Sequence, residues 1–240
     1  MTDLGYSSER IIPAIMPENF EHLKEEMERF VSLVPMVQID VMDGKFTDSK
    51  SWPYEGGLDK EFVKIINQEE GFPFWEDLDI EVDLMVTNPM KEADQWIAAG
   101  VARVIVHFES DTPENIKLTL ASIKEKGIET GIAFGLETTQ DVLNSFYKEN
   151  QDNIDVVQFM GIEKIGFQGQ PFNGGVLERI KSFKESFPQV KVSVDGSVNF
   201  DTAEKLAEAG ADYLVIGSAL QQTDSSLSET IEQFDSFLKY

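Results

Sequence analysis

The feature that most constrains the fold of this chain is a regular alternation of short apolar runs with stretches of helical periodicity. The short runs are rich in β-branched residues and have the length of buried strands. We expect strands at Ile11–Met16, Met36–Val41, Ile80–Val86, Val104–Phe108, Thr130–Phe134, Ile154–Met160, Val190–Val194 and Tyr213–Ile216. Eight strands, each followed by a helix, is the number that closes a (β/α)8 barrel, also called a TIM barrel.

The stretches between the strands carry apolar residues at the spacing of one helix face. We expect helices at Glu18–Leu33, Pro113–Lys126 and Asp224–Leu238, with the stripe of the first formed by Phe20, Leu23, Met27, Phe30 and Val34. The pair Thr112-Pro113 is typical of a helix start, and Gly100, Gly127 and Gly210 stand where glycine ends a helix before a strand. The boundary signals therefore agree with the periodicity.

One domain is the simplest organisation for this pattern. A doubly wound sheet is the alternative, but it needs no such eightfold count. No linker or shift in composition divides the chain, so we interpret residues 1–240 as a single α/β barrel domain. The longest irregular stretches, Lys45–Leu58 and Gly161–Phe172, both follow strands. They should lie at the carboxyl end of the barrel, where barrel enzymes place their sites.

The charge and the cysteine content of the chain limit the kinds of molecule that we expect it to bind. The formal net charge is −24, which argues against nucleic acid and an anionic membrane as partners, because binding to either by surface charge needs a basic face. The absence of cysteine excludes disulfides, thiolate metal sites and a thiol nucleophile. No apolar run approaches the roughly 18 residues of a membrane span, and the start, MTDLGYSSER, is unlike a signal peptide. We expect a cytoplasmic protein whose anionic ligands would be held by backbone amides and helix ends.

Polar residues gather where the predicted strands end. They are Gln38, Asp40, Asp43, Asp83, His107, Glu109 and Asp195. Alternate residues of a barrel strand point inward, so Gln38 and Asp40 share one face, and Asp40 and Asp195 could face each other across the mouth. Two opposed carboxylates suit removal of a proton from one face of a carbon and its return on the other. Crowded acids also raise one another's pKa or require a cation between them.

Simpler explanations exist for several of these residues. Asp43, which precedes Gly44, fits a turn. His107 on an apolar strand fits a hydrogen-bonded core histidine, and Asp83 could be satisfied by neighbouring backbone. Asp40 and Asp195 are harder to explain in this way, because each ends an apolar run and is costly to bury without a partner.

The last two strands carry a second signal, a Gly-Ser pair at each end. These pairs are Gly196-Ser197 and Gly217-Ser218. Glycine lets a ligand approach the backbone, and the helix that follows directs free N–H groups toward an anion. The loops after strands 7 and 8 are a frequent phosphate site in barrel enzymes. Gly166 and Gly169, in the loop GFQGQ, add a third glycine-bearing element beside them.

With these residues in view, the sequence resembles the ribulose-phosphate 3-epimerase family from IIPAIMPENF almost to its end. The likeness is carried by IDVMDGKF, VDLMVTNP, AGVARVIVHFES, GFQGQPF, VDGSVNFDTAEKLAEAGAD and VIGSAL. The resemblance implies a (β/α)8 barrel enzyme that interconverts ketose phosphates, such as ribulose 5-phosphate and xylulose 5-phosphate, at C3. In that family two aspartates move the proton, and a divalent metal ion binds the enediolate.

The resemblance also implies a role for individual residues. The acid/base pair falls on Asp40 and Asp195. The pocket methionines of the family match Met42, Met85 and Met160, and its phosphate site matches Gly196, Ser197, Gly217 and Ser218. The metal ligands fall on Gln38, Asp40, Asp83 and Asp195. A small-molecule sugar phosphate is then the expected partner, and a homo-oligomer is left open.

The metal shell departs from the family pattern, which has histidine at the positions of Gln38 and Asp83. Imidazole suits zinc and ferrous iron, whereas oxygen ligands suit magnesium and manganese. The all-oxygen set therefore favours manganese or magnesium. Outside the shell, Ala14 replaces a serine, Gly135-Leu136 an asparagine-proline pair and Ile165 a proline, and the segment after Phe46 does not follow the family's lid.

Three interpretations follow from these departures. The chain is a working epimerase with an altered metal, an epimerase for another ketose phosphate, or a phosphosugar-binding protein that has lost catalysis. Decarboxylases and synthases of related phosphate-binding barrels fit less well. They require a lysine beside the aspartate of the third strand, and here Leu84 and Met85 follow Asp83.

Overall fold

The computed structural model describes residues 5–221 and 226–238, and its strands form a closed barrel of eight parallel strands in sequence order. The strands are β1 (Ile11–Ile15), β2 (Met36–Met42), β3 (Asp79–Met85), β4 (Arg103–His107), β5 (Glu129–Phe134), β6 (Val156–Met160), β7 (Lys191–Asp195) and β8 (Tyr213–Ile216). The predicted (β/α)8 barrel is confirmed, and each predicted strand boundary agrees to within two residues. The doubly wound alternative is wrong, because β1 pairs with β8.

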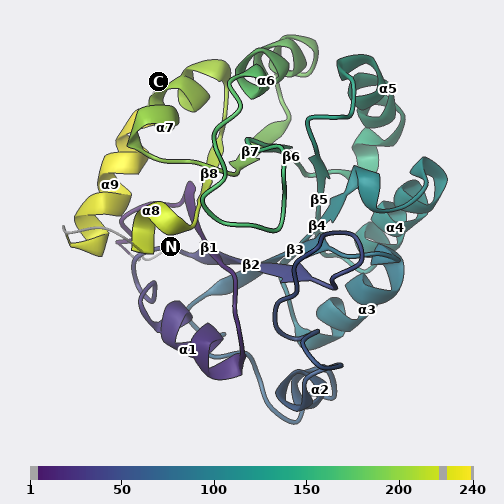
Figure 1. Ribbon diagram of the computed structural model, residues 1–240, viewed down its shortest axis with the longest axis vertical. Helices are drawn as coiled ribbons and strands as arrows, with labels where there is room; N and C mark the ends of the chain where they lie inside the picture. The colour runs from purple at the N-terminus through teal and green to yellow at the C-terminus, as the bar shows by residue number, and fades with distance from the viewer. Residues whose placement is uncertain (1–4, 222–225, 239–240) are drawn as a thin grey trace.

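The helices form a ring outside the barrel (Figure 1). They are α1 (Phe20–Glu28), α2 (Lys60–Ile66), α3 (Pro89–Ala99), α4 (Pro113–Glu125), α5 (Gln140–Asn150), α6 (Gly175–Ser186), α7 (Phe200–Ala209), α8 (Ser218–Gln221) and α9 (Leu227–Phe237). Short 3-10 turns at Phe108–Ser110 and Gln151–Asn153 follow β4 and α5. Among the described residues, no helix combines the length and the apolar character needed to cross a membrane.

The main hydrophobic core lies between the strands and this ring of helices. On β2, Val37, Ile39 and Val41 belong to that core, and the alternate residues Gln38 and Asp40 point into the barrel. The interior of the barrel is therefore where buried polar side chains collect.

The first helix is shorter than its periodicity predicts. It begins after Asn19, whose side chain accepts a hydrogen bond from the backbone of His22, and it ends at Glu28 instead of Leu33. The chain then turns, with Ser32 at a positive φ of 64°, yet Phe30 and Val34 remain buried. The apolar spacing therefore continues past the end of the helix because Phe30 and Val34 are buried, and not because they are helical.

Other helix boundaries follow the sequence signals. Thr112 caps α4, and Gly100 and Gly210 adopt left-handed conformations at φ of 96° and 111°, which end α3 and α7. Within the predicted helix Asp224–Leu238, α9 begins at Leu227, while residues 224–225 lie outside the described part of the chain. The N-terminal expectation about a signal peptide rests in part on residues 1–4, which also lie outside it.

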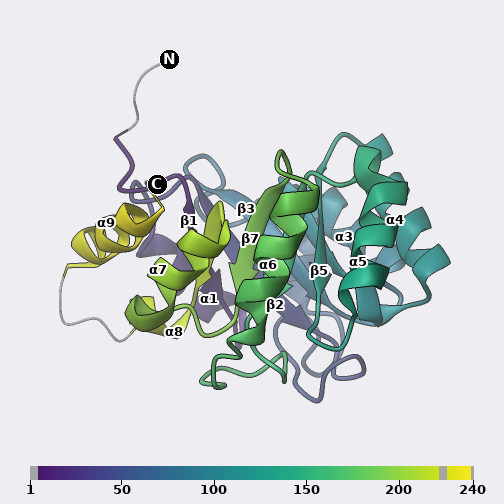
Figure 2. The same ribbon diagram turned by 90° about the horizontal axis from the view of Figure 1, so that it is seen from above.

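The long loops after β2 and β6 lie at the same end of the barrel, the lower edge of Figure 2. Two contacts join them. The ammonium of Lys164 lies 3.4 Å from a carboxylate oxygen of Asp48, and a Cβ built on Gly166 would stand 3.0 Å from Thr47. This end is the carboxyl end of the strands, as predicted.

The opposite end of the barrel holds a partly buried ion network. Arg103 on β4 binds Glu81 on β3 at 2.6 Å and Glu129 on β5 at 2.7 Å. Glu81 is fully buried, and burial raises its pKa while Arg103 opposes the rise. Because a buried carboxylate without a partner is costly, Arg103 should contribute strongly to stability.

We predict that Arg103→Leu lowers the free energy of unfolding by about 3–5 kcal/mol, since it leaves Glu81 buried without its cation. Urea denaturation followed by circular dichroism measures the change. Lys126→Met is the matched control, because Lys126 pairs with Asp94 at the surface, where ion pairs contribute about 0–1 kcal/mol. Equal effects of the two substitutions would contradict the prediction.

Candidate functional site

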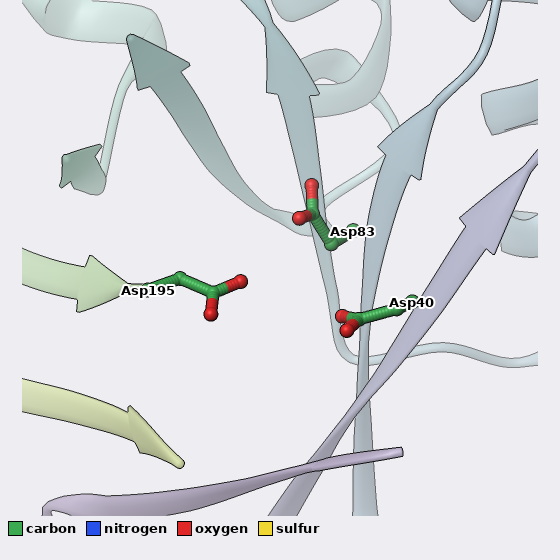
Figure 3. Close-up of side chains that lie close together, drawn as sticks. All are labelled: Asp40, Asp83 and Asp195. Atoms are coloured by element: carbon green, nitrogen blue, oxygen red, sulfur yellow. The ribbon is translucent and has the colours of Figure 1, made fainter. Parts of the chain in front are cut away.

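Three aspartates from separate strands meet at the carboxyl end of the barrel. Asp40 of β2 and Asp83 of β3 are register partners, and Asp195 ends β7. One carboxylate oxygen from each lies within 4.8 Å of the others. Figure 3 shows Asp195 reaching toward Asp40 and Asp83 from the opposite side. Parallel closure of the barrel thus brings together acids that are far apart in the sequence.

The amide of Gln38 joins two of these carboxylates. Its nitrogen donates to Asp40 Oδ1 at 2.7 Å and to Asp195 Oδ2 at 3.0 Å. The amide oxygen is buried and has no hydrogen-bond partner among the described residues. Gln38 therefore presents its nitrogen to the acids, and it would have to turn its amide over to offer oxygen to a cation.

The third carboxylate is paired with a histidine. His107 Nε2 lies 2.9 Å from Asp83 Oδ1, and both side chains are fully buried. Burial alone would lower the pKa of His107, but the charge of Asp83 and the hydrogen bond to it raise it overall. This favours the imidazolium form, which balances one negative charge. His107 is thus a hydrogen-bonded histidine within the barrel. Among the described residues, the closest hydrogen-bond partner of Asp83 is this imidazole and not the neighbouring backbone.

The pKa values of Asp40 and Asp195 are raised. For Asp40 burial is the largest cause, followed by the charges of Asp195 and Asp83, and the bond from Gln38 opposes them. Burial and the charge of Asp83 raise the pKa of Asp195 to about 7. The hydrogen bond from Gln38 and the charge of His107 lower it and so oppose the rise. A carboxyl group that titrates near neutral pH can both take up and release a proton there, as general acid/base work requires.

A cavity of about 240 Å³ opens beside the pair. Asp40 and Asp195 line one part of it, Met85 and Met160 provide apolar wall, and the two Gly-Ser pairs line another part. The site residues predicted from the sequence that line this cavity are Asp40, Met85, Met160, Gly166, Gly169, Asp195, Gly196, Ser197, Gly217 and Ser218. The cavity is mostly built from the ends of β6, β7 and β8 and from the loop after β6.

Three predicted site residues lie outside this lining. Gln38 and Asp83 are fully buried and are not part of the cavity lining, although Asp83 is the register partner of Asp40. Met42 is also fully buried, and its sulfur would stand 3.1 Å from a Cβ built on Gly166. Met42 therefore lies under the loop after β6, whereas Met85 and Met160 face the cavity.

Sequence reasoning missed some of the lining. Ile162 and Asn199 line the cavity without a signal in the sequence, and Ala14 differs from the family only by lacking the hydroxyl of a serine. Ser197 has a positive φ of 56°, and its hydroxyl donates to the carbonyl of Gln170. The hydroxyl of Ser197 thus fastens the loop after β6, and its backbone remains the group that could meet a ligand.

The other polar residues at strand ends have structural partners. Asp43 accepts hydrogen bonds from the backbone of Lys45, Phe46 and Thr87, which fits the predicted turn. Glu109 accepts from the backbone of Gly135 and from the hydroxyl of Thr138. Neither residue lines the cavity beside Asp40 and Asp195.

Comparison with known proteins identifies relatives over most of the chain. Ribulose-phosphate 3-epimerase from Chlamydia trachomatis serovar D is 31% identical over 222 residues, which cover 90% of this chain and 87% of the relative. The Bacillus subtilis enzyme of the same name is 30% identical, with 88% and 91% covered. The cytoplasmic isoform from Oryza sativa subsp. japonica is 27% identical, with 88% and 86% covered.

Solved structures share the fold at low identity. 3-Hexulose-6-phosphate synthase from Salmonella typhimurium has a TM-score of 0.67 at 14% identity, covering 95% of this chain and 98% of that one. 3-Keto-L-gulonate-6-phosphate decarboxylase from Vibrio cholerae has a TM-score of 0.65 at 13% identity, covering 95% and 98%. At this identity the likeness concerns the barrel alone. The model of the ribulose-phosphate 3 epimerase family matches residues 10–221, and the chain belongs to that family.

Proposed function

We propose that this protein interconverts ribulose 5-phosphate and xylulose 5-phosphate by moving a proton at C3, with Asp40 and Asp195 as the two proton carriers. The observation that carries the proposal is the pairing of these carboxylates in one cavity with raised pKa values. Membership of the epimerase family supports the reaction class. The substrate and the residue roles are the proposal.

The chemistry needs one ionised and one protonated carboxyl group. The ionised group takes the proton from C3, and the electron pair moves toward the C2 carbonyl to give an enediolate. The protonated group then returns a proton to the opposite face of C3. Because Asp40 and Asp195 come from β2 and β7, they approach the cavity from different sides. Reversing the reaction exchanges their roles, which suits two carboxyl groups whose pKa values are both raised by burial.

The same cavity offers a place for the phosphate. Gly196, Ser197, Gly217 and Ser218 line it, and the described residues of its lining include no lysine or arginine. Backbone N–H groups can hold a phosphate without cationic side chains, which fits a chain of net charge −24. Helix α8 has only four described residues, so the grip would come from local amides more than from a helix dipole.

The donor set fits a divalent metal ion. Asp40, Asp83 and Asp195 offer oxygens within 4.8 Å of one another. Such an ion would polarise the substrate oxygens as negative charge develops on them. An all-oxygen set favours manganese or magnesium over zinc or iron.

The proposal predicts that the purified protein, stripped of metal and resupplied with manganese, magnesium, zinc or iron in turn, converts ribulose 5-phosphate to xylulose 5-phosphate. The rate should be highest with manganese or magnesium. A coupled assay for xylulose 5-phosphate measures it. No conversion with any of the four metals, or conversion only of a different ketose phosphate, would overturn the proposed substrate and reaction.

Substituting either proton carrier should abolish most turnover. Asp40→Asn and Asp195→Asn keep the shape and remove the base, so kcat should fall by ~10² to 10⁴. Asp43→Asn is the matched control, because Asp43 lies on the same strand end but caps a turn outside the cavity. A kcat within twofold of the parent for either Asp40→Asn or Asp195→Asn would remove that residue from the mechanism.

A methyl group in the phosphate corner should weaken substrate binding. A Cβ on Gly217 would meet only Ala14, at 3.8 Å, so Gly217→Ala fits the fold and occupies cavity space. We predict a KM at least ~10-fold higher, which corresponds to about 1.4 kcal/mol, with little change in thermal stability. Steady-state kinetics and a melting curve measure the two effects. An unchanged KM would place the phosphate elsewhere in the cavity.

A further inference from the structure

Both amide hydrogens of Gln38 are directed at the acid/base pair. The nitrogen lies 2.7 Å from an oxygen of Asp40 and 3.0 Å from an oxygen of Asp195, and the side chain is fully buried. An amide nitrogen carries two donors, so these two bonds use its donating capacity. Hydrogen bonds to ionised acceptors are the stronger kind. Gln38 thus ties together two carboxylates from strands on different sides of the barrel.

The carboxylates that Gln38 joins are also those that would ligate a metal ion. To act as a ligand, Gln38 would turn its amide over, present its oxygen and lose both hydrogen bonds. Its nitrogen would then occupy the position of the present oxygen, which has no partner among the described residues. The amide in its present orientation occupies Asp40 Oδ1 and Asp195 Oδ2, so a cation that binds these two oxygens has to displace it.

The third acid does not depend on Gln38. Asp83 is bonded to His107 at 2.9 Å, so its charge is balanced by a different group. Gln158, the other glutamine within the barrel wall at this level, lies 3.5 Å from Asp83 through its amide nitrogen. Gln38 and Gln158 are both fully buried, but only the first joins Asp40 to Asp195.

We propose that Gln38 is a positioning residue that cross-links Asp40 and Asp195 through its amide nitrogen and opposes metal binding there. The part of the proposal that concerns turnover rests on the proposed epimerase function. The cross-link holds the two proton carriers at a fixed separation before substrate arrives. It also makes Gln38 an antagonist of the metal ion, in place of the ligand that its sequence position implies.

The two roles predict opposite changes in metal affinity. If Gln38 is a ligand, Gln38→Leu removes a donor and weakens binding of Mn²⁺. If Gln38 is the cross-link, Gln38→Leu frees carboxylate oxygens and strengthens it. We expect Mn²⁺ to bind on the order of tenfold more tightly, the equivalent of ~1.4 kcal/mol. Titration calorimetry and the electron paramagnetic resonance signal of free Mn²⁺ measure the affinity without turnover.

Thr119→Val is the control, because it removes a buried polar group on α4 whose hydroxyl donates to the carbonyl of Asn115, and it leaves the three aspartates unchanged. It should change the affinity for Mn²⁺ less than threefold. Gln38→Met keeps the length of the side chain and serves as a second variant if Gln38→Leu does not fold. Weaker or unchanged Mn²⁺ binding in the folded Gln38 variant, or no measurable binding in either parent or variant, overturns the proposal.

A kinetic measurement tests the cross-link through the metal requirement. Because a bound cation displaces the amide, Gln38→Leu should lower the Mn²⁺ concentration that gives half-maximal turnover by on the order of tenfold, while Thr119→Val should change it less than threefold. An unchanged or higher Mn²⁺ requirement in Gln38→Leu would contradict the cross-link. If the parent does not turn over ribulose 5-phosphate, the proposed function fails, and the Mn²⁺ titration still decides the role of Gln38.

Discussion

The cost of burying three carboxylates at one end of a barrel is the constraint on which the rest of this site depends. Closure of eight parallel strands brings Asp40, Asp83 and Asp195 within 4.8 Å of one another, and charges at that spacing in a low-dielectric interior repel strongly. The protein reduces the cost in three ways. His107 balances Asp83, Gln38 donates to the other two, and the pKa values of Asp40 and Asp195 rise, which favours their protonated forms.

The two ends of the barrel treat buried charge differently. At the amino end, Arg103 binds both Glu81 and Glu129, and the network serves stability. At the carboxyl end, three carboxylates lie close together and one imidazole, that of His107, pairs with one of them. Unpartnered buried polar atoms occur among the described residues at both ends, Glu81 Oε1 at the amino end and Gln38 Oε1 and His107 Nδ1 at the carboxyl end. Partly satisfied polar groups in a core are costly, and they are retained where binding or proton transfer can use them. The loop after β6 and the Gly-Ser pairs complete the cavity at that end.

Much of the fold and the convergence of the acids follow from local patterns in the sequence. Strand length, β-branched runs and glycine stops are local signals. Because the strand ends of a parallel barrel meet at one face, the proximity of Asp40, Asp83 and Asp195 could be predicted from the sequence. Other features depend on tertiary neighbours. The end of α1 at Glu28 has no glycine stop, and the positive φ values of Ser32 and Ser197 are rare for a serine. Family position suggests a ligand at Gln38, but the orientation of its amide is set by the two acceptors that surround it.

The central claim is that Asp40 and Asp195 act on opposite faces of C3 of the substrate. The direct test is turnover of ribulose 5-phosphate in deuterated water, with the label at C3 followed by nuclear magnetic resonance in the first few per cent of reaction. Because one group removes the original proton and the other delivers a solvent-derived one, xylulose 5-phosphate should carry deuterium at C3 from the start, while recovered ribulose 5-phosphate remains largely unlabelled. Product that retains the original C3 proton would contradict the two-carboxylate account.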